Sequence, residues 1–119
     1  MLSVKAQEFV DRWTGKSIDF EAYKSGVNPF VLSGNKFASV AMQFLMDRGS
    51  CTKMELTDYL IEHAGARGHW GMGTAGSHAG IVFDAFEHLG IITILEGKAH
   101  LVSNNGQNLL GFSDPLLAR

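Results

Sequence analysis

This sequence has little of what marks several classes of protein. Its 119 residues include a single cysteine, Cys51, so no disulfide can form within the chain, and there is neither a Cys-x-x-Cys pair nor a Cys/His array for zinc. No run approaches the roughly 18 to 20 apolar residues that a membrane span requires. The first dozen residues contain acidic side chains and lack the continuous apolar core of a secretory signal. We therefore expect an intracellular, cytoplasmic protein without membrane association.

An excess of basic residues is also missing. Lys and Arg number 10 against 12 Asp and Glu, for a formal net charge of −2. This balance gives no general attraction to nucleic acid or anionic lipid, so any such binding must come from a local patch. What the chain does have is 45% hydrophobic residues, which is typical of a globular protein, and a length that predicts one domain with one core.

The N-terminal third predicts one helix and a connecting arm. Apolar residues from Ala6 to Trp13 fall on one helical face, Ser3 precedes them, and Gly15 is a helix stop. Residues 14–33 follow as an arm with one or two helical turns before Gly26, because Asn28-Pro29 disfavours a continuing helix. We divide the chain into this N-terminal segment (1–33), a core domain (34–112) and a tail (113–119).

Three core helices are predicted next. The first, after Asn35, has apolar residues at helical spacing from Phe37 to Leu45. The second begins at the Thr52-x-x-Glu55 capping box and runs from about 53 to 64. We expect it to bury Met54, Leu56, Leu60 and Ile61. The third begins near Ser77 and ends at Gly90, with an inner face of Ala79, Val82, Phe83, Phe86 and Leu89.

A β-hairpin follows the helices. Residues 91–95 are short and β-branched, Glu96-Gly97 is a tight-turn signal, and residues 99–102 can return as a second strand. Helices followed by one hairpin do not give the alternating β-α-β units of a parallel sheet.

The segment from Gly68 to Gly80, GHWGMGTAGSHAG, contains the letters G-x-G-x-x-G. In a dinucleotide site this motif follows a buried strand that aims the turn at the pyrophosphate. Residues 64–70 are AGARGHW, which is no buried strand. We therefore favour a long turn leading into the third helix over a phosphate cradle, and we expect no cofactor.

The order of three helices and a hairpin, with AFEHLGIITILEGKAHLVSNNGQNLL at its end, resembles the winged helix-turn-helix family. The resemblance spans about residues 36–110. It implies a mainly α fold, here with an extra N-terminal helix, in which the third helix reads the DNA major groove and the hairpin wing touches the backbone. The implied function is duplex DNA binding in transcription regulation. The residues that it places at the DNA are Lys53, Arg67, His69, Thr74, Ser77, His78, Lys98 and His100.

Charge leaves a second hypothesis open. From Gly65 to Ser103 only Arg67 and Lys98 can neutralise phosphate, against Asp84, Glu87 and Glu96. The alternative is a module that binds a protein partner through the glycine-rich segment, with Trp70, Met72, Gly73 and Gly76 at the contact. The glycines would then allow close approach, unless they only serve φ > 0 in a long turn.

An enzyme or a metal site is not expected. The five histidines form no H-x-x-x-H or H-E-x-x-H pair. Cys51 precedes a predicted helix, whose dipole can lower a thiol pKa, but a lone cysteine is usually a small buried residue.

We also expect a homodimer, formed through the N-terminal and C-terminal segments. Their apolar residues lie outside the core motif and need to be buried. These residues are Phe9, Trp13, Phe20, Tyr23, Phe30, Leu116 and Leu117.

Overall fold

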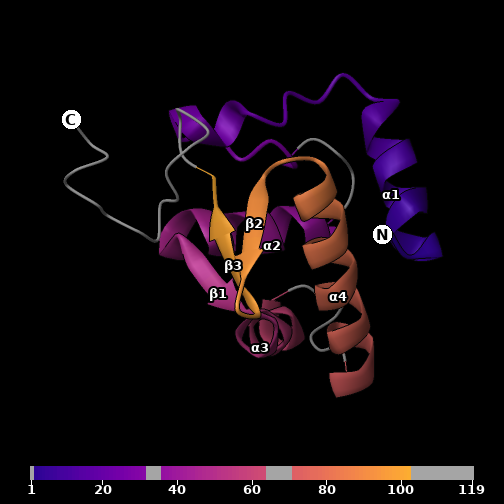
Figure 1. Cartoon of the computed structure of the whole chain (residues 1–119), viewed down its shortest axis with the longest axis vertical. Helices are drawn as coiled ribbons and strands as arrows, with labels where there is room; N and C mark the ends of the chain where they lie inside the picture. The colour runs from indigo at the N-terminus through magenta and orange to yellow at the C-terminus, as the bar shows by residue number, and fades with distance from the viewer. Residues whose placement is uncertain (1, 32–35, 64–70, 103–119) are drawn as a thin grey trace.

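A computed structural model describes residues 2–31, 36–63 and 71–102 (Figure 1). The helices in these ranges are α1 (Val4–Thr14), α2 (Lys36–Arg48), α3 (Lys53–His63) and α4 (Met72–His88), and a 3-10 turn, η1, spans Ala22–Ser25. The strands are β1 (Ser50–Thr52), β2 (Ile92–Leu95) and β3 (Lys98–Leu101). The predicted class, mainly helical with a small antiparallel sheet, is confirmed. None of the helices in the described ranges is long and apolar enough to cross a membrane.

Helix α1 begins and ends where its sequence predicts. The backbone N–H of Ala6 donates to Oγ of Ser3 at 3.2 Å, which satisfies one of the N–H groups left open at a helix start. At the other end the N–H of Gly15 donates to the carbonyl of Asp11 at 3.1 Å. The helix packs its buried face on α4, so it belongs to the same core as the rest of the chain.

The capping box at the start of α3 is confirmed. The N–H of Glu55 donates to Oγ1 of Thr52 at 3.1 Å, and the N–H of Thr52 donates to Oε1 of Glu55 at 2.8 Å. Leu56 and Leu60 are buried as predicted, and Ile61 is partly buried. The prediction for Met54 was wrong: its side chain is 62% exposed, because it lies in the first turn on the side away from the core.

A strand that the sequence did not predict completes the sheet. Residues 50–52 pair antiparallel with β3, so that Ser50 lies opposite His100 and Thr52 opposite Lys98. The strand order is therefore β1-β3-β2. The predicted hairpin is confirmed, and its turn residues Glu96 (φ 52°) and Gly97 (φ 78°) both adopt the left-handed backbone that a tight two-residue hairpin favours.

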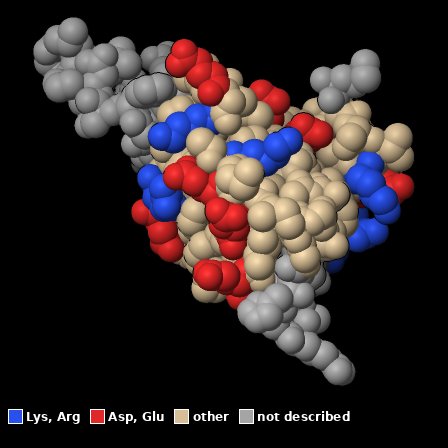
Figure 2. Space-filling model, turned by 90° about the horizontal axis from the view of Figure 1, so that it is seen from below, with Lys and Arg blue, Asp and Glu red and all other residues tan. Residues whose placement is uncertain are grey.

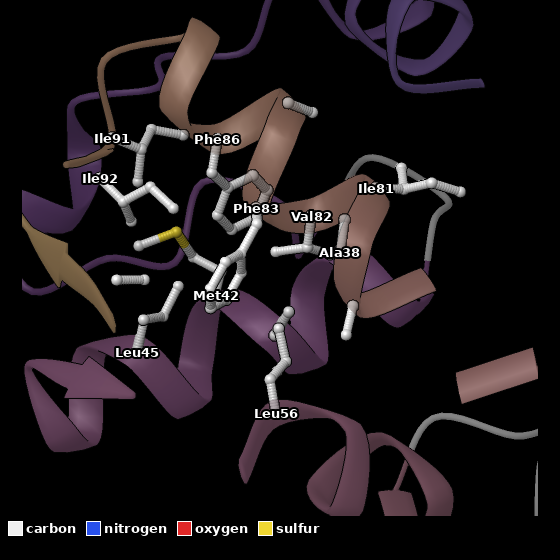
Figure 3. Packing of buried hydrophobic residues seen from close by; sticks show 14 of the residues in the cluster. Ala38, Met42, Leu45, Leu56, Ile81, Val82, Phe83, Phe86, Ile91 and Ile92 are labelled. Atoms are coloured by element: carbon white, nitrogen blue, oxygen red, sulfur yellow. The ribbon is translucent and has the colours of Figure 1, made fainter. Parts of the chain in front are cut away.

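The core forms where α2, α3, α4 and the sheet meet. Figure 3 shows Met42 of α2 in the middle of this cluster, with Phe86 of α4, Leu56 of α3 and Ile92 of β2 around it. All four side chains are at most 2% exposed. Ile81 lies at the edge of the same cluster and is 9% exposed. Most of the residues that helical spacing assigned to the core are therefore buried.

The aromatic residues of the N-terminal segment pack against this core and enlarge it. Phe30 stacks on Phe86 with ring centroids 5.1 Å apart, and Trp13 meets Phe30 edge-on at 4.9 Å. Tyr23 is buried, and Phe9 and Phe20 are partly buried. Trp13, Tyr23 and Phe30 are thus buried by their own chain and do not need a second copy to cover them, so the homodimer stays a prediction. Leu116 and Leu117 lie outside the described residues.

The Thr52–Glu55 cap gives the first prediction. Thr52→Ala should lower the free energy of unfolding by about 1 kcal/mol, because it leaves an N–H group of the first turn without its acceptor. Urea denaturation at pH 7 measures this loss. Thr14→Ala, an exposed residue at the end of α1, is the control and should change stability by less than about 0.5 kcal/mol.

The same cap should be sensitive to acid. Hydrogen bonding from the Thr52 N–H, opposed in part by burial and aided by Arg48, holds the pKa of Glu55 below its ordinary value of 4.5. A lowered pKa stabilises the fold above the ordinary value and loses that contribution as pH falls through the folded-state pKa. Glu55→Gln should therefore flatten the loss of stability between pH 5 and 3 (about the window of carboxylate titration). An unchanged pH profile would contradict this role.

Candidate nucleic-acid interface

Helix α4 carries six of the twelve residues that the sequence placed at a binding surface. Its inner side is fully buried through Ala75, Ala79 and Val82. Its outer side begins with Met72, Gly73, Thr74 and Ser77, all exposed. The two sides differ because side chains three and four apart share a helical face. Thr74 and Ser77 are therefore available to a ligand at the start of the helix.

The glycine-rich segment was partly misread as a turn. Helix α4 begins at Met72 rather than near Ser77, and Gly71 is its N-cap with an extended backbone (φ −73°, ψ 167°). Gly73, Gly76 and Gly80 are helical, and none of them has positive φ. The suggestion that Gly73 and Gly76 serve φ > 0 in a long turn was wrong.

The same geometry argues against a dinucleotide cradle. Such a cradle needs its glycines in the turn between a parallel strand and a helix. Here two of the three motif glycines, Gly73 and Gly76, lie inside the helix, and the sheet of the described chain is antiparallel. The G-x-G-x-x-G letters thus fall on a helix rather than on a phosphate loop.

In the part of the chain that the structure describes, no neighbouring atom requires glycine at these helical positions. A Cβ atom built at Gly73, Gly76 or Gly80 meets no atom within 4 Å other than its own helix and chain neighbours. Each helical glycine costs about 1 kcal/mol relative to alanine, since it loses more backbone entropy on folding. Among the described residues there is therefore room for a methyl group at all three positions, although only Gly73 is exposed and Gly76 and Gly80 are half-buried.

His78 is held by its own helix and by α2. Its Nδ1 lies 2.8 Å from the carbonyl oxygen of Thr74, and its ring meets Phe37 edge-on at 4.7 Å. Because a carbonyl only accepts hydrogen bonds, Nδ1 carries the proton in this arrangement. His78 is half-buried and helps to fix α4 on α2, which leaves less of it for a ligand than the sequence suggests.

The predicted wing and helix cations come together. Lys98 begins β3 opposite Thr52, and Lys53 follows Thr52 at the start of α3, so two exposed lysines adjoin the same strand end. This proximity depends on β1, which the sequence did not predict. Glu55 lies close enough for Lys98 and Arg48 to lower its pKa, and Arg48 approaches its carboxylate at 3.2 Å. An acidic group therefore lies beside the lysine pair.

His100 is the predicted contact that the fold encloses. Its side chain is 6% exposed, and it lies on the central strand β3 opposite Ser50 and Thr93. Burial, followed by the charge of Lys98, lowers its pKa. A neutral, enclosed imidazole is not placed to contact a phosphate. Arg67, His69 and Trp70 lie outside the described residues.

Positive and negative side chains are mixed on the end of the molecule where α3 and the first turns of α4 lie. Figure 2 shows Lys and Arg in separate small groups with Asp and Glu among them, around an uncharged area. Helix α4 has no Lys or Arg, while Asp84 and Glu87 lie in its second half, and α3 exposes Asp58 and Glu62. Lys53 and Lys98 are therefore the exposed cations of this end that the sequence placed at the DNA and that the structure describes, while Arg48 nearby is paired with Glu55.

Cys51 has the opposite of a reactive environment. Its side chain is fully buried in β1, and burial, then Glu55, raises its pKa to about 12. It is thus the small buried residue that a lone cysteine suggests. Among the described residues, no three His, Cys, Asp or Glu side chains gather where they could hold a metal ion.

Comparison with known proteins adds no relative: neither a protein-family model, nor a curated protein sequence, nor a solved structure matches the chain. Function must therefore be argued from the residues and their geometry.

The space beside the glycines of α4 leads to a further prediction about stability. Gly76→Ala and Gly80→Ala should each raise the free energy of unfolding by about 1 kcal/mol, because a methyl group fits without a clash and the unfolded chain loses freedom. Denaturant titration measures the gain. Gly97→Ala is the matched control: its φ of 78° is unfavourable for alanine, so the same substitution should destabilise. Loss of stability at Gly76 and Gly80 would contradict the presence of this space.

Proposed function

We propose that this chain is a winged helix-turn-helix protein that binds duplex DNA in transcription regulation, with α4 as recognition helix and β2–β3 as wing. The element order carries the proposal. Three helices, α2, α3 and α4, precede a hairpin, and β1 joins the hairpin's inner strand β3. Because one fold can serve many functions, the proposal also depends on which groups the surface of α4 and of the hairpin exposes.

The start of α4 supports a contact with the duplex. It exposes Thr74 and Ser77, and its first-turn N–H groups lie on a helix of 17 residues that ends on the far side of the core. Such N–H groups favour a phosphate oxygen, and exposed hydroxyls donate to phosphates and base edges. Lys53 and Lys98 would add two charged phosphate contacts from α3 and the wing.

The small number of exposed cations determines how strongly we expect the chain to bind DNA and how its affinity depends on salt. The logarithm of the affinity falls with the logarithm of salt concentration at about −0.9 per phosphate neutralised, so two lysines predict a slope of about −2. Such a protein binds weakly as one copy, and two copies on one duplex would add their contacts. A homodimer therefore belongs to this proposal as the form that binds DNA usefully.

Lys53→Ala combined with Lys98→Ala tests the proposed interface. The double variant should lower the affinity for all duplex sequences alike, since phosphate contacts carry no sequence information. It should also bring the salt slope about 2 closer to zero, because two fewer phosphates are neutralised. Fluorescence anisotropy with random and genomic duplexes at low and physiological salt measures both quantities.

Lys5→Ala with Lys24→Ala is the control, because it removes the same charge from α1 and η1. If it reduces binding as much as the Lys53 and Lys98 pair does, the effect is one of net charge and not of a site. Absence of binding by the unaltered protein even at low salt retires the DNA proposal.

A second candidate function rests on the glycine face. Three helical glycines, of which Gly73 is exposed and Gly76 and Gly80 are half-buried, have no described side chain or backbone packed against them, and Gly73 adjoins the exposed side chain of Met72. An interface core is typically apolar and depleted of charge, and glycines allow the backbones to approach closely. A protein partner on this face is therefore the alternative, with Met72, Gly73 and Gly76 at the contact.

The glycine variants separate the two functions. If a protein docks on the face, Gly76→Ala with Gly80→Ala should reduce its capture on an affinity column at least tenfold, although the same protein is more stable. Thr14→Ala serves as control and should leave capture unchanged. Equal capture by all three proteins contradicts docking through these glycines.

A further inference from the structure

The N-terminal segment forms an apolar groove that the DNA proposal does not use. It has a volume of about 520 Å³, within the range of pockets that take a ligand-sized apolar group. Its walls come from the connection between α1 and residue 31. The lining residues are Lys16, Ser17, Ile18, Asp19, Ala22, Val27, Asn28, Pro29 and Val31.

Two of these residues are exposed apolar side chains on one short segment. Val27 is 58% exposed and Val31 is 62% exposed, whereas the aromatic residues around them, Tyr23 and Phe30, are buried. Exposed valines a few residues apart around a groove are costly to hydrate and favour a covering group. The question is what that group is.

The last described residue, Val102, is hydrogen-bonded to η1, the turn that contributes one lining residue of the groove. The N–H of Val102 donates to the carbonyl of Ile91 at 3.0 Å, and the carbonyl of Val102 accepts from the Tyr23 hydroxyl at 3.0 Å. Tyr23 belongs to η1, and Ala22, its neighbour in that turn, lines the groove. Residues 103–119 therefore follow a residue that is hydrogen-bonded to Tyr23, the sequence neighbour of the lining residue Ala22.

The composition of residues 103–119 fits an apolar groove. They have only two charged side chains, Asp114 and Arg119. Their large apolar residues are Leu109, Leu110, Phe112, Leu116 and Leu117. At about 3.3 Å per residue the chain can carry Leu109 about 20 Å from Val102, enough to reach a neighbouring turn.

We propose that the C-terminal segment, residues 103–119, packs its leucines and Phe112 into the groove that residues 16–31 of the same chain form. A tethered segment is present at an effective concentration of about millimolar or more, so it outcompetes a free partner of equal intrinsic affinity. The segment is then an internal ligand that joins the two ends of the chain and holds the N-terminal arm on the core. This inference does not depend on DNA binding.

A thermodynamic cycle in the full-length chain tests the contact. One variant changes Leu109, Leu110, Phe112, Leu116 and Leu117 to serine, and a second combines Val27→Asp with Val31→Asp. Each should lower Tm by about 4 to 8 °C. Because both remove the same contact, the combined protein should lose no more than the larger single loss.

Val4→Asp is the matched control for the groove variant. Val4 is 78% exposed and lies on α1 outside the groove, so its effect should add to that of the serine variant. Circular dichroism checks that each protein keeps its helices. Additive losses for the groove and tail variants, or no loss in either, would overturn the proposal.

Concentration dependence distinguishes the chain's own tail from that of another copy. The Tm difference between the unaltered protein and the serine variant should stay constant from low to high micromolar concentration, with both proteins monomeric in sedimentation without DNA. A difference that grows with concentration, together with a dimer that the serine substitutions dissolve, would overturn packing within one chain and assign the groove to a second copy.

Discussion

The contact between Phe86 and Phe30 is the interaction on which the rest of the structure depends. Phe86 lies in the cluster that joins α2, α3, α4 and the sheet, and its ring stacks on Phe30 of the arm with an interplanar angle of 8°. Trp13 then meets Phe30, which brings α1 to the same core. An aromatic pair of this kind adds about 0.5 to 1.5 kcal/mol beyond its buried area. Through this contact a helix and an arm that look separate in sequence become part of one domain.

Helix α4 is packed between α1, α3 and the sheet, and this packing determines which of its residues are buried and which are exposed. The inner positions are occupied by fully buried residues such as Ala79, Val82 and Phe86, so that Gly73 is exposed and Gly76 and Gly80 lie half-buried at the flank of this face. They lower stability there without serving the packing of the chain. A fold that tolerates this cost has a surface suited to close approach, whether by a nucleic-acid backbone or by a protein.

Electrostatics limits how the surface can work. The two lysines that β1 and β3 bring together are accompanied by Glu55, and α4 itself has acidic side chains in its second half. Binding of DNA through such a face would rely on backbone N–H groups, hydroxyls and few charges, so its salt dependence would be shallow. The buried, high-pKa thiol of Cys51 and the enclosed imidazole of His100 take no part in it, because burial disfavours their charged forms.

The helices and the hairpin could be predicted from local signals in the sequence. Apolar spacing, Ser3, the Thr52–Glu55 box and Glu96-Gly97 predicted the helices and the hairpin, because caps, turns and helical periodicity act over a few neighbouring residues. Other features became visible only in the folded chain. They are the three-residue strand β1, the burial of His100, the start of α4 at Met72 and the burial of Trp13 and Phe30 by their own chain. These features depend on pairing and packing between residues far apart in sequence. Phe30 and Phe86 carry no local signal that they will meet, and Thr52 none that it will lie opposite Lys98.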